Sequence, residues 1–228
     1  MIEKLRVVGP FQCNCRLFIC PKTKNAFVVD PGDQVDELLK MIDDAADELG
    51  DSIHVQGLFH THAHLDHIGA TADLREALMN RQKTAPIVLL HQDDLPLYQQ
   101  LKMQRELFGI PHLKDAPEVN QYFEHEEIIK CGELKIEVIH TPGHSPGSVC
   151  LRLHEDSDLG VSETLLSGDT LFKQSVGRTD LWGASEEQMM KSIRDRILSL
   201  DGDTRVCPGH GPDTIIGIEK RENPFLVY

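Results

Sequence analysis

Four potential metal ligands stand close together in the segment Thr61-His62-Ala63-His64-Leu65-Asp66-His67. Imidazole nitrogens and carboxylate oxygens both bind divalent cations. At spacings of one and two residues, these side chains cannot all point the same way from a regular helix or strand. We therefore expect a tight loop after the apolar run 55–59, able to direct ligands at two metal ions.

Three further candidate ligands each follow a strand-like run and stand in a glycine-containing loop. They are His144 in Pro142-Gly143-His144, Asp169 in Gly168-Asp169-Thr170 and His210 in Pro208-Gly209-His210-Gly211. A single histidine or aspartate in such a loop is more often an ordinary turn residue. Because ligand types recur in four loops of the same kind, the combination favours a dinuclear metal site.

These segments resemble the metallo-β-lactamase superfamily, and within it the compact, single-domain, glyoxalase II-like (hydroxyacylglutathione hydrolase-like) group. The resemblance begins at Val29-Asp30-Pro31-Gly32-Asp33, includes Gly177-Arg178-Thr179-Asp180 and reaches the His210 loop. It implies an α/β fold of the αββα sandwich type with mixed sheets, formed as one domain over residues 1–228. The residue pattern alone predicts only a mixed α/β class with antiparallel strands.

The resemblance also assigns roles to the candidate residues. It implies one metal held by His62, His64 and His144, a second held by Asp66, His67 and His210, and Asp169 between them. Asp66 and Asp169 are then the expected catalytic residues. Two divalent metal ions are expected, with zinc first and iron or manganese as alternatives, because the ligand set has no thiolate. Asp30, Thr61 and Thr170 are candidates to support the ligand histidines by hydrogen bonds, as are His60 and His140.

The expected reaction is the hydrolysis of a small-molecule thioester such as S-lactoylglutathione by a hydroxide that bridges the metals. Metal binding can lower the pKa of water from 15.7 to about 7. A thiol has a pKa near 8.5, so its thiolate leaves without a proton donor, and the ligand loops offer no obvious one. Arg178 and Lys173 are the cations expected to contact an anionic substrate, and in glyoxalase II a basic residue at the place of Arg178 contacts glutathione.

Two features depart from glyoxalase II and leave glutathione recognition open. Pro212 replaces the family's tyrosine two residues after the last ligand histidine, and only 18 residues follow His210. The C-terminal helical domain that completes the glutathione pocket is therefore not expected.

Two other enzyme classes remain open. A persulfide dioxygenase would use one iron held by His62, His144 and Asp169 as a facial triad. A lactonase or other small-ester hydrolase would use the same metal pair, with an acyl chain covered by an apolar rim. That rim is expected at Leu101, Met103, Leu107, Phe108 and Ile110.

Composition excludes other classes of function. The formal net charge of −14 and pI near 5.2 argue against binding nucleic acid through its phosphates. No apolar stretch predicts a membrane span and the first residues do not read as a signal peptide, so we expect a cytoplasmic protein. The six cysteines are expected as reduced, buried thiols. The sequence does not indicate the oligomeric state.

Strand and helix patterns alternate along the chain. A helix is expected from a cap at Asp33 to a stop at Gly50, another from the ligand loop to about Arg81, and a third over 185–199. Residues 91–123 read as an irregular excursion forming a rim or lid. Strands are expected at 5–8, 15–20, 26–29, 55–59, 86–90, 126–130, 134–139, 148–153, 163–167 and 204–207.

Overall fold

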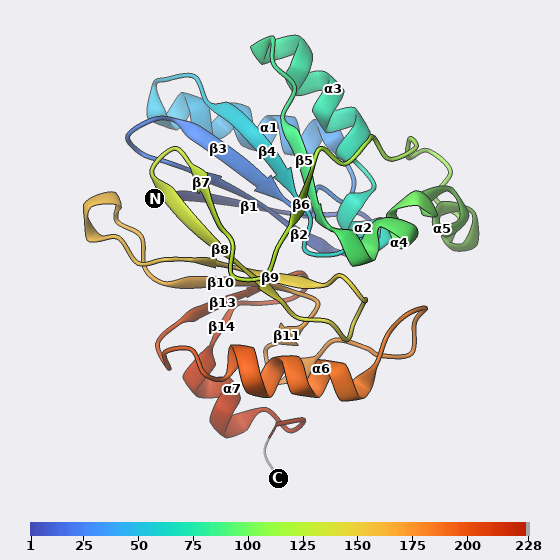
Figure 1. Cartoon of the computed structure of the whole chain (residues 1–228). Helices are drawn as coiled ribbons and strands as arrows, with labels where there is room; N and C mark the ends of the chain where they lie inside the picture. The colour runs from blue at the N-terminus through green and yellow to red at the C-terminus, as the bar shows by residue number, and fades with distance from the viewer. Residues whose placement is uncertain (227–228) are drawn as a thin grey trace.

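The computed structural model describes residues 1–226 and has two six-stranded sheets packed face to face, with helices on both outer faces (Figure 1). The first sheet has the order β1-β2-β3-β4-β5-β6, with bounds Ile2–Val8, Cys13–Ile19, Asn25–Val29, His54–Phe59, Ile87–His91 and Gln121–Phe123. The second has the order β14-β13-β10-β9-β8-β7, with bounds Thr214–Ile215, Arg205–Pro208, Thr164–Gly168, Val149–Leu153, Leu134–His140 and Ile128–Cys131. A two-stranded ribbon pairs β11 (Leu171–Phe172) with β12 (Ser175–Val176). The expected αββα sandwich with mixed sheets is confirmed.

The space between the sheets is filled by aromatic and aliphatic side chains. Phe18, Phe27, Phe59 and Phe123 form a row across the first sheet, with successive ring centroids 5.2, 4.8 and 5.7 Å apart. Aliphatic residues of β8 and β9 complete the same buried cluster from the second sheet. Burial of large apolar side chains, each contributing about 1.5–3 kcal/mol, holds the two sheets together.

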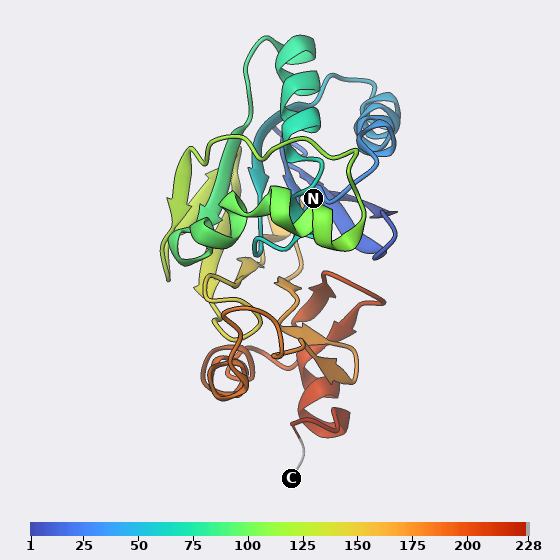
Figure 2. The same cartoon turned by 90° about the vertical axis from the view of Figure 1, so that its right-hand side faces the viewer.

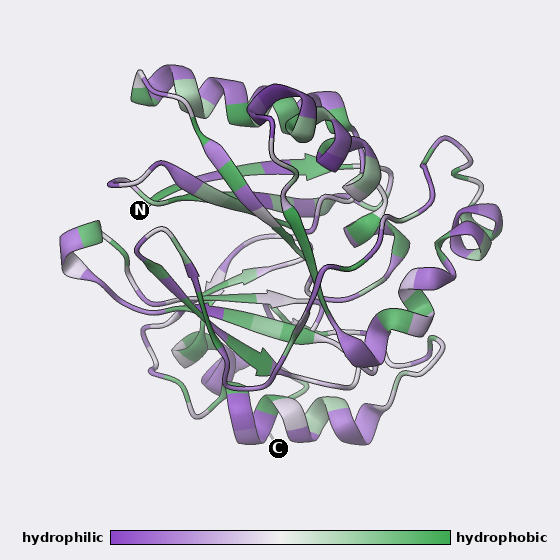
Figure 3. Cartoon of the chain, turned by 45° about the horizontal axis from the view of Figure 1, so that its top comes forward, coloured by the Kyte–Doolittle hydropathy of each residue, from purple (hydrophilic) through white to green (hydrophobic). Residues whose placement is uncertain are grey.

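Helices α1 (Val35–Leu49) and α3 (Thr71–Gln82) cover the first sheet, while α6 (Glu186–Ser192) and α7 (Ile216–Glu222) cover the second. In α1 the buried residues Leu38, Met41, Ile42 and Ala45 recur at helical spacing. Figure 3 shows the consequence, with hydrophobic strands inside and many hydrophilic residues on the outer helices.

The predicted helix ends are partly confirmed. Gly50 ends α1 with φ of 61°, and its N–H donates to the carbonyls of Ala46 and Asp47. The predicted cap at Asp33 is wrong, because the residue before the helix is Gln34, whose left-handed backbone directs the chain into it. The carboxylate of Asp33 instead accepts a hydrogen bond from the N–H of Gln34. The helix predicted over 185–199 is α6 continued by a π-helical turn, Ile193–Ile197.

The segment after β5 forms one edge of the molecule. A 3₁₀ turn (Gln92–Asp94) leads into α4 (Leu95–Gln99) and α5 (Leu101–Phe108), and the chain returns as β6. Figure 2 shows α4 and α5 on the side that faces the viewer. A second 3₁₀ turn (Ser157–Leu159) lies in the β9–β10 connection.

Strand directions bring several carboxyl ends to one edge of the sandwich. In the second sheet β10 runs parallel to β13, and β8 and β10 are both antiparallel to β9. Strands β8, β10 and β13 therefore all run the same way, and a candidate ligand follows each of them. In the first sheet β3 and β4 are parallel, so the segments after them are neighbours as well.

Two expectations from composition can be compared with the described residues. Within 1–226, no helix combines the length and hydropathy needed to cross a bilayer. All six cysteines are unpaired and buried, as expected.

Candidate metal centre

The seven candidate ligands come together from both sheets at this edge. His62 and His64 lie in the segment after β4, whereas Asp66 and His67 lie on the short helix α2 (Leu65–Ile68). The prediction of one ligand loop is therefore partly wrong, because the helical turn begins at Leu65 and its rotation separates the two ligand pairs. The other ligands are in the segments after β8, β10 and β13, namely His144, Asp169 and His210.

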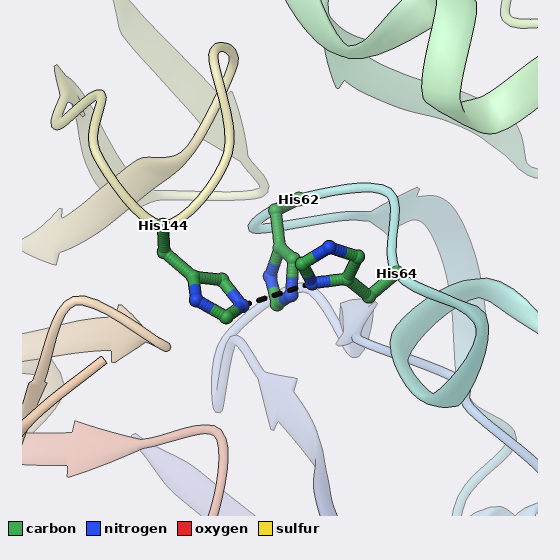
Figure 4. A group of neighbouring side chains, drawn as sticks. All are labelled: His62, His64 and His144. Atoms are coloured by element: carbon green, nitrogen blue, oxygen red, sulfur yellow. Dashed lines mark hydrogen bonds between the residues drawn. The ribbon is translucent and has the colours of Figure 1, made fainter. Parts of the chain in front are cut away.

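His62, His64 and His144 form the first ligand group (Figure 4). One ring nitrogen of each lies within 4.8 Å of the others, and Nδ1 of His64 is 2.9 Å from Nε2 of His144. The ring planes meet at 87° for His62 and His64, 80° for His62 and His144, and 83° for His64 and His144. Rings so oriented can direct their in-plane lone pairs at a common point.

Asp66, His67 and His210 form the second ligand group. Oδ2 of Asp66 is 3.1 Å from Nε2 of His210 and 3.6 Å from Nε2 of His67. The two Nε2 atoms are 3.2 Å apart.

Asp169 lies between the two groups. Its Oδ1 is 3.5 Å from Nε2 of His67, and its Oδ2 is 3.5 Å from Nε2 of His144 and 3.6 Å from Nε2 of His210. One carboxylate thus faces ligand atoms of both groups, which is the arrangement that a bridging ligand requires.

Hydrogen bonds on the outer side of the histidines set which nitrogen faces the centre. Nδ1 of His67 lies 3.0 Å from Oδ2 of Asp30 and donates to it. Nδ1 of His144 donates to the carbonyl of Arg178, and Nδ1 of His210 to the carbonyl of Gln12. Nδ1 of His62 lies 3.1 Å from Oγ1 of Thr61. With these protons pointing outward, four Nε2 lone pairs face inward, as metal-binding histidines require.

Asp30 organises this outer layer from the segment after β3. It is buried and accepts hydrogen bonds from the N–H and the hydroxyl of Thr61, at 2.8 and 2.7 Å, besides that from His67. Its φ of 53° is a left-handed conformation that aspartate tolerates better than most residues. The expected support by Asp30 and Thr61 is therefore present.

The residues fit divalent metal ions by two further observations. Nε2 of His62 and Oδ1 of Asp169 are buried and have no hydrogen-bond partner among the described residues, which a metal ion between them would supply. Burial lowers the pKa of His62 well below its usual range, and burial beside His144 lowers the pKa of His64 to about 3. Both imidazoles are then neutral near pH 7, the form that binds metal.

Sequence reasoning missed Asp94, a buried residue that ties two ligand segments together. One of its carboxylate oxygens accepts hydrogen bonds from the N–H of Ala63 and the hydroxyl of Ser145, both at 2.8 Å, and the other from the N–H of Gly147 at 2.6 Å. Its position just after β5, at the same edge as the ligands, was the signal that could have found it.

Asn14 was also missed, and it holds the His210 loop from β2. Its side-chain amide donates to the carbonyls of Pro208 and Gly211. In that loop a Cβ at Gly209 would lie 2.4 Å from Oδ1 of Asp169, so only glycine lets the backbone pass the bridging carboxylate.

Other expected supports do not contact the ligand histidines. The hydroxyl of Thr170 lies 3.1 Å from that of Thr141. His60 is buried and bonds to Leu89 and Thr71, while Nε2 of His140 donates to the carbonyl of Pro146. The outer-layer role expected for these three residues is not seen in their hydrogen bonds.

A cavity of about 370 Å³ opens above the two ligand groups. Arg178 lines it, and its guanidinium forms two bonds with the carboxylate of Asp180, at 2.7 and 2.8 Å. Lys173 is exposed and does not line this cavity. The geometry therefore brings Arg178 to the site and leaves Lys173 outside it.

Comparisons with known proteins agree with this geometry. The profile of the metallo-beta-lactamase superfamily matches residues 8–210. Hydroxyacylglutathione hydrolase GloC of Haemophilus influenzae is 35% identical over 220 residues, which cover 96% of this chain and 95% of that protein. Among solved structures, TTHA1623 in a di-iron-bound form is 36% identical with a TM-score of 0.81, covering 98% of this chain and 100% of that one. BLEG-1 B3 metallo-beta-lactamase is 33% identical with a TM-score of 0.83, covering 100% of both chains. The chain belongs to the metallo-beta-lactamase superfamily and is a metallo-hydrolase within it.

Proposed function

We propose that the protein hydrolyses a small-molecule thioester at two divalent metal ions, with S-lactoylglutathione as the first compound to test. Zinc is the metal we propose, and iron or manganese are the alternatives. The observation that carries the proposal is the carboxylate of Asp169, which faces two complete ligand groups at 3.5 to 3.6 Å.

In this proposal the histidines and the two aspartates have different roles. Two bound metal ions supply a Lewis acid and a strong nucleophile at neutral pH. The five histidines hold the ions as neutral imidazoles, and outer hydrogen bonds fix the tautomers of four of them, His62, His67, His144 and His210. Asp66 and Asp169 add negative charge, and their oxygens are acceptors that can orient the attacking water, which makes them the proposed catalytic residues.

The residues around the cavity favour a thioester over an amide. Among the described residues that line it there is no tyrosine, lysine, serine or cysteine to protonate an amine leaving group. A thiolate needs no such donor, because the pKa of a thiol is near 8.5. The name of the Haemophilus influenzae relative, a hydroxyacylglutathione hydrolase, supports the same choice.

The second ligand group favours the dinuclear hydrolase over a mononuclear iron dioxygenase. If the metal were one iron held by His62, His144 and Asp169, the residues Asp66, His67 and His210 would bind no metal. These three gather as closely as the first group, with ligand atoms within 4.8 Å of one another.

We also propose that the reaction takes place in the cytoplasm, because six unpaired cysteines suit a reducing compartment.

The test is thiol release from S-lactoylglutathione by purified protein loaded separately with zinc, iron or manganese. We expect hydrolysis that depends on metal and is lost in His64→Asn, because His64 belongs to the first ligand group but not to the dioxygenase triad. Oxygen uptake with glutathione persulfide, retained together with one iron in His64→Asn, would contradict the proposal.

A further inference from the structure

The walls of the cavity above the metal centre are apolar and exposed. Its floor is formed by metal ligands, and its walls come from three separate parts of the chain. The turn between β1 and β2 gives Phe11, helix α5 gives Met103, Leu107 and Phe108, and the segment after Arg178 gives Trp182.

These wall residues are unusually exposed for their type. The exposed fraction is 41% for Phe11, 56% for Met103, 76% for Leu107, 48% for Phe108 and 63% for Trp182. Of the twelve large hydrophobic residues exposed within 1–226, five thus gather around one cavity. An exposed apolar surface of this kind, continuous with a reactive centre, marks a binding site for an apolar group.

Two of the walls already touch each other. The rings of Phe11 and Phe108 meet edge to face with centroids 5.4 Å apart. On the inner side, Gln104 of the same helix accepts a hydrogen bond from the N–H of Leu65, next to the ligands His64 and Asp66. Helix α5 is therefore held against the metal centre rather than extending away from it.

Side-chain cations are scarce in the same cavity. Among the described residues that line it, Arg178 is the only lysine or arginine, and it is already bonded to Asp180. A glutathione moiety carries two carboxylates, whose binding needs unpaired cations.

Resting on the thioesterase activity proposed above, we propose that the preferred substrates are thioesters with an apolar acyl group, a medium-length alkyl chain or an aromatic ring. The acyl group lies against Phe11, Met103, Leu107, Phe108 and Trp182, and the carbonyl carbon lies at the floor. Water adds its oxygen to that carbon and the C–S bond breaks. The products are the carboxylic acid and the thiol, whose sulfur takes the remaining proton.

The test is the chain-length dependence of hydrolysis on one thiol carrier. Acetyl, butyryl, hexanoyl, phenylacetyl and lactoyl thioesters of N-acetylcysteamine are compared on one metal-loaded preparation. A fully buried methylene is worth about fourfold in kcat/KM and a half-buried one about twofold. We expect hexanoyl to exceed acetyl by at least about tenfold, and phenylacetyl to exceed lactoyl.

Substitutions test whether the apolar wall residues cause the chain-length dependence. Met103→Ala and Trp182→Ala should each lower the hexanoyl-to-acetyl ratio several-fold. The matched control is Met79→Ala, because Met79 is 52% exposed on α3 and does not line the cavity, and it should leave the ratio unchanged.

The possible failures can be told apart. Hydrolysis with a flat or falling chain-length profile overturns the apolar acyl assignment and leaves the thioesterase standing. The assignment also fails if Met79→Ala changes the ratio as much as Met103→Ala. If protein carrying two metal ions hydrolyses none of these thioesters, the thioesterase proposal itself fails.

Discussion

Two histidine clusters lie at the same edge of the sandwich, and only one has the geometry that suits a dinuclear metal centre. The first contains the seven ligands described above. The second contains His91 at the end of β5, His140 at the end of β8, and Asp93, whose ligand atoms also lie within 4.8 Å of one another. Residue type and distance are therefore shared by the two clusters, and neither explains the difference between them.

Ring orientation separates the two clusters. The rings of His91 and His140 are stacked, with centroids 3.9 Å apart and planes at 13°. Parallel rings direct their in-plane lone pairs side by side, not at one point. In the first ligand group the ring planes meet at 80 to 87°.

Hydrogen bonding separates them as well. Nδ1 of His91 accepts from the N–H of Asp93, and Nε2 of His140 donates to the carbonyl of Pro146. Those bonds tie the rings to their own loops. In the metal centre the outer bonds go to other elements, such as Asp30 and Arg178, and leave inward lone pairs facing a common space. The comparison indicates that the outer hydrogen bonds decide whether the nitrogens of a histidine cluster face a common space, as a metal site requires.

The largest difference is expected from matched substitutions in the two clusters. Asp169→Asn removes the negative charge that faces both ligand groups, and should lower kcat/KM by about 10³-fold or more. His91→Asn should stay within about threefold of wild type, because the hydrogen bond and the ring contact of His91 go to Asp93 and His140, not to the seven candidate ligands. The kcat/KM values of both variants are measured from initial rates of thiol release. Circular dichroism checks first that each variant is folded. Equal losses in the two variants would remove the distinction.

A second, smaller effect is expected from the outer layer. Asp30→Asn weakens the bonds that orient His67 and Thr61, and should lower metal affinity by about 10- to 100-fold. The matched control is Asp33→Asn, because Asp33 is also buried but contacts Gln34 and His112 instead of ligands. Competition with a chelator of known affinity measures both variants. A loss as large in Asp33→Asn would show that burial alone, and not the bond to His67, sets the affinity.

The smallest effect concerns the pH dependence of the stacked pair. Burial and the nearby His140 lower the pKa of His91 from 6.5 to about 4, while Asp93 opposes and His125 adds to the shift. The folded protein thus favours the neutral ring. The stability it contributes is complete above pH 6.5 and is lost as the pH falls towards 4.

Between pH 6.5 and 4, His91→Gln should therefore lose about 1 kcal/mol less of its free energy of unfolding than the wild type does. This figure allows for solvent screening of a partly exposed group. Urea unfolding of chelated protein at several pH values measures it. Identical pH profiles for wild type and variant would show that the stack does not titrate in this range.

The convergence of the seven candidate ligands has a physical reason that the sequence pattern indicated. Each candidate ligand follows an apolar strand, and strand ends that run the same way meet at one edge of a sheet. This pattern, together with the family resemblance, indicated that His144, Asp169 and His210 converge. Asp30 was expected for another reason, because ligand histidines usually donate their second N–H to an oxygen. The gathering of the seven candidate ligands could therefore be predicted without knowing any side-chain contact.

What escaped prediction depends on packing between distant segments. Asp94 and Asn14 act through bonds to loops far away in sequence, so no local pattern reveals which groups they hold, although the position of Asp94 after β5 marks it as a candidate. In the apolar rim expected over 101–110, Leu101 and Ile110 are buried in the core, whereas Met103, Leu107 and Phe108 line the cavity. In a short helix, the local sequence does not show which hydrophobic residues pack into the core and which line the cavity. The two-stranded ribbon β11–β12, the short strand β14 and the helix α7 were missed because tertiary contacts, not propensity, stabilise them.

The most direct test of the two-metal account is a count of metal ions per chain by elemental analysis, on wild type and on the double variant His91→Asn/His140→Asn. The account predicts about two ions per chain in both proteins, with thiol release in the wild-type sample. About one ion per chain in wild type would contradict the dinuclear centre. Loss of an ion in the double variant would show that the stacked cluster, and not only the converging one, binds metal.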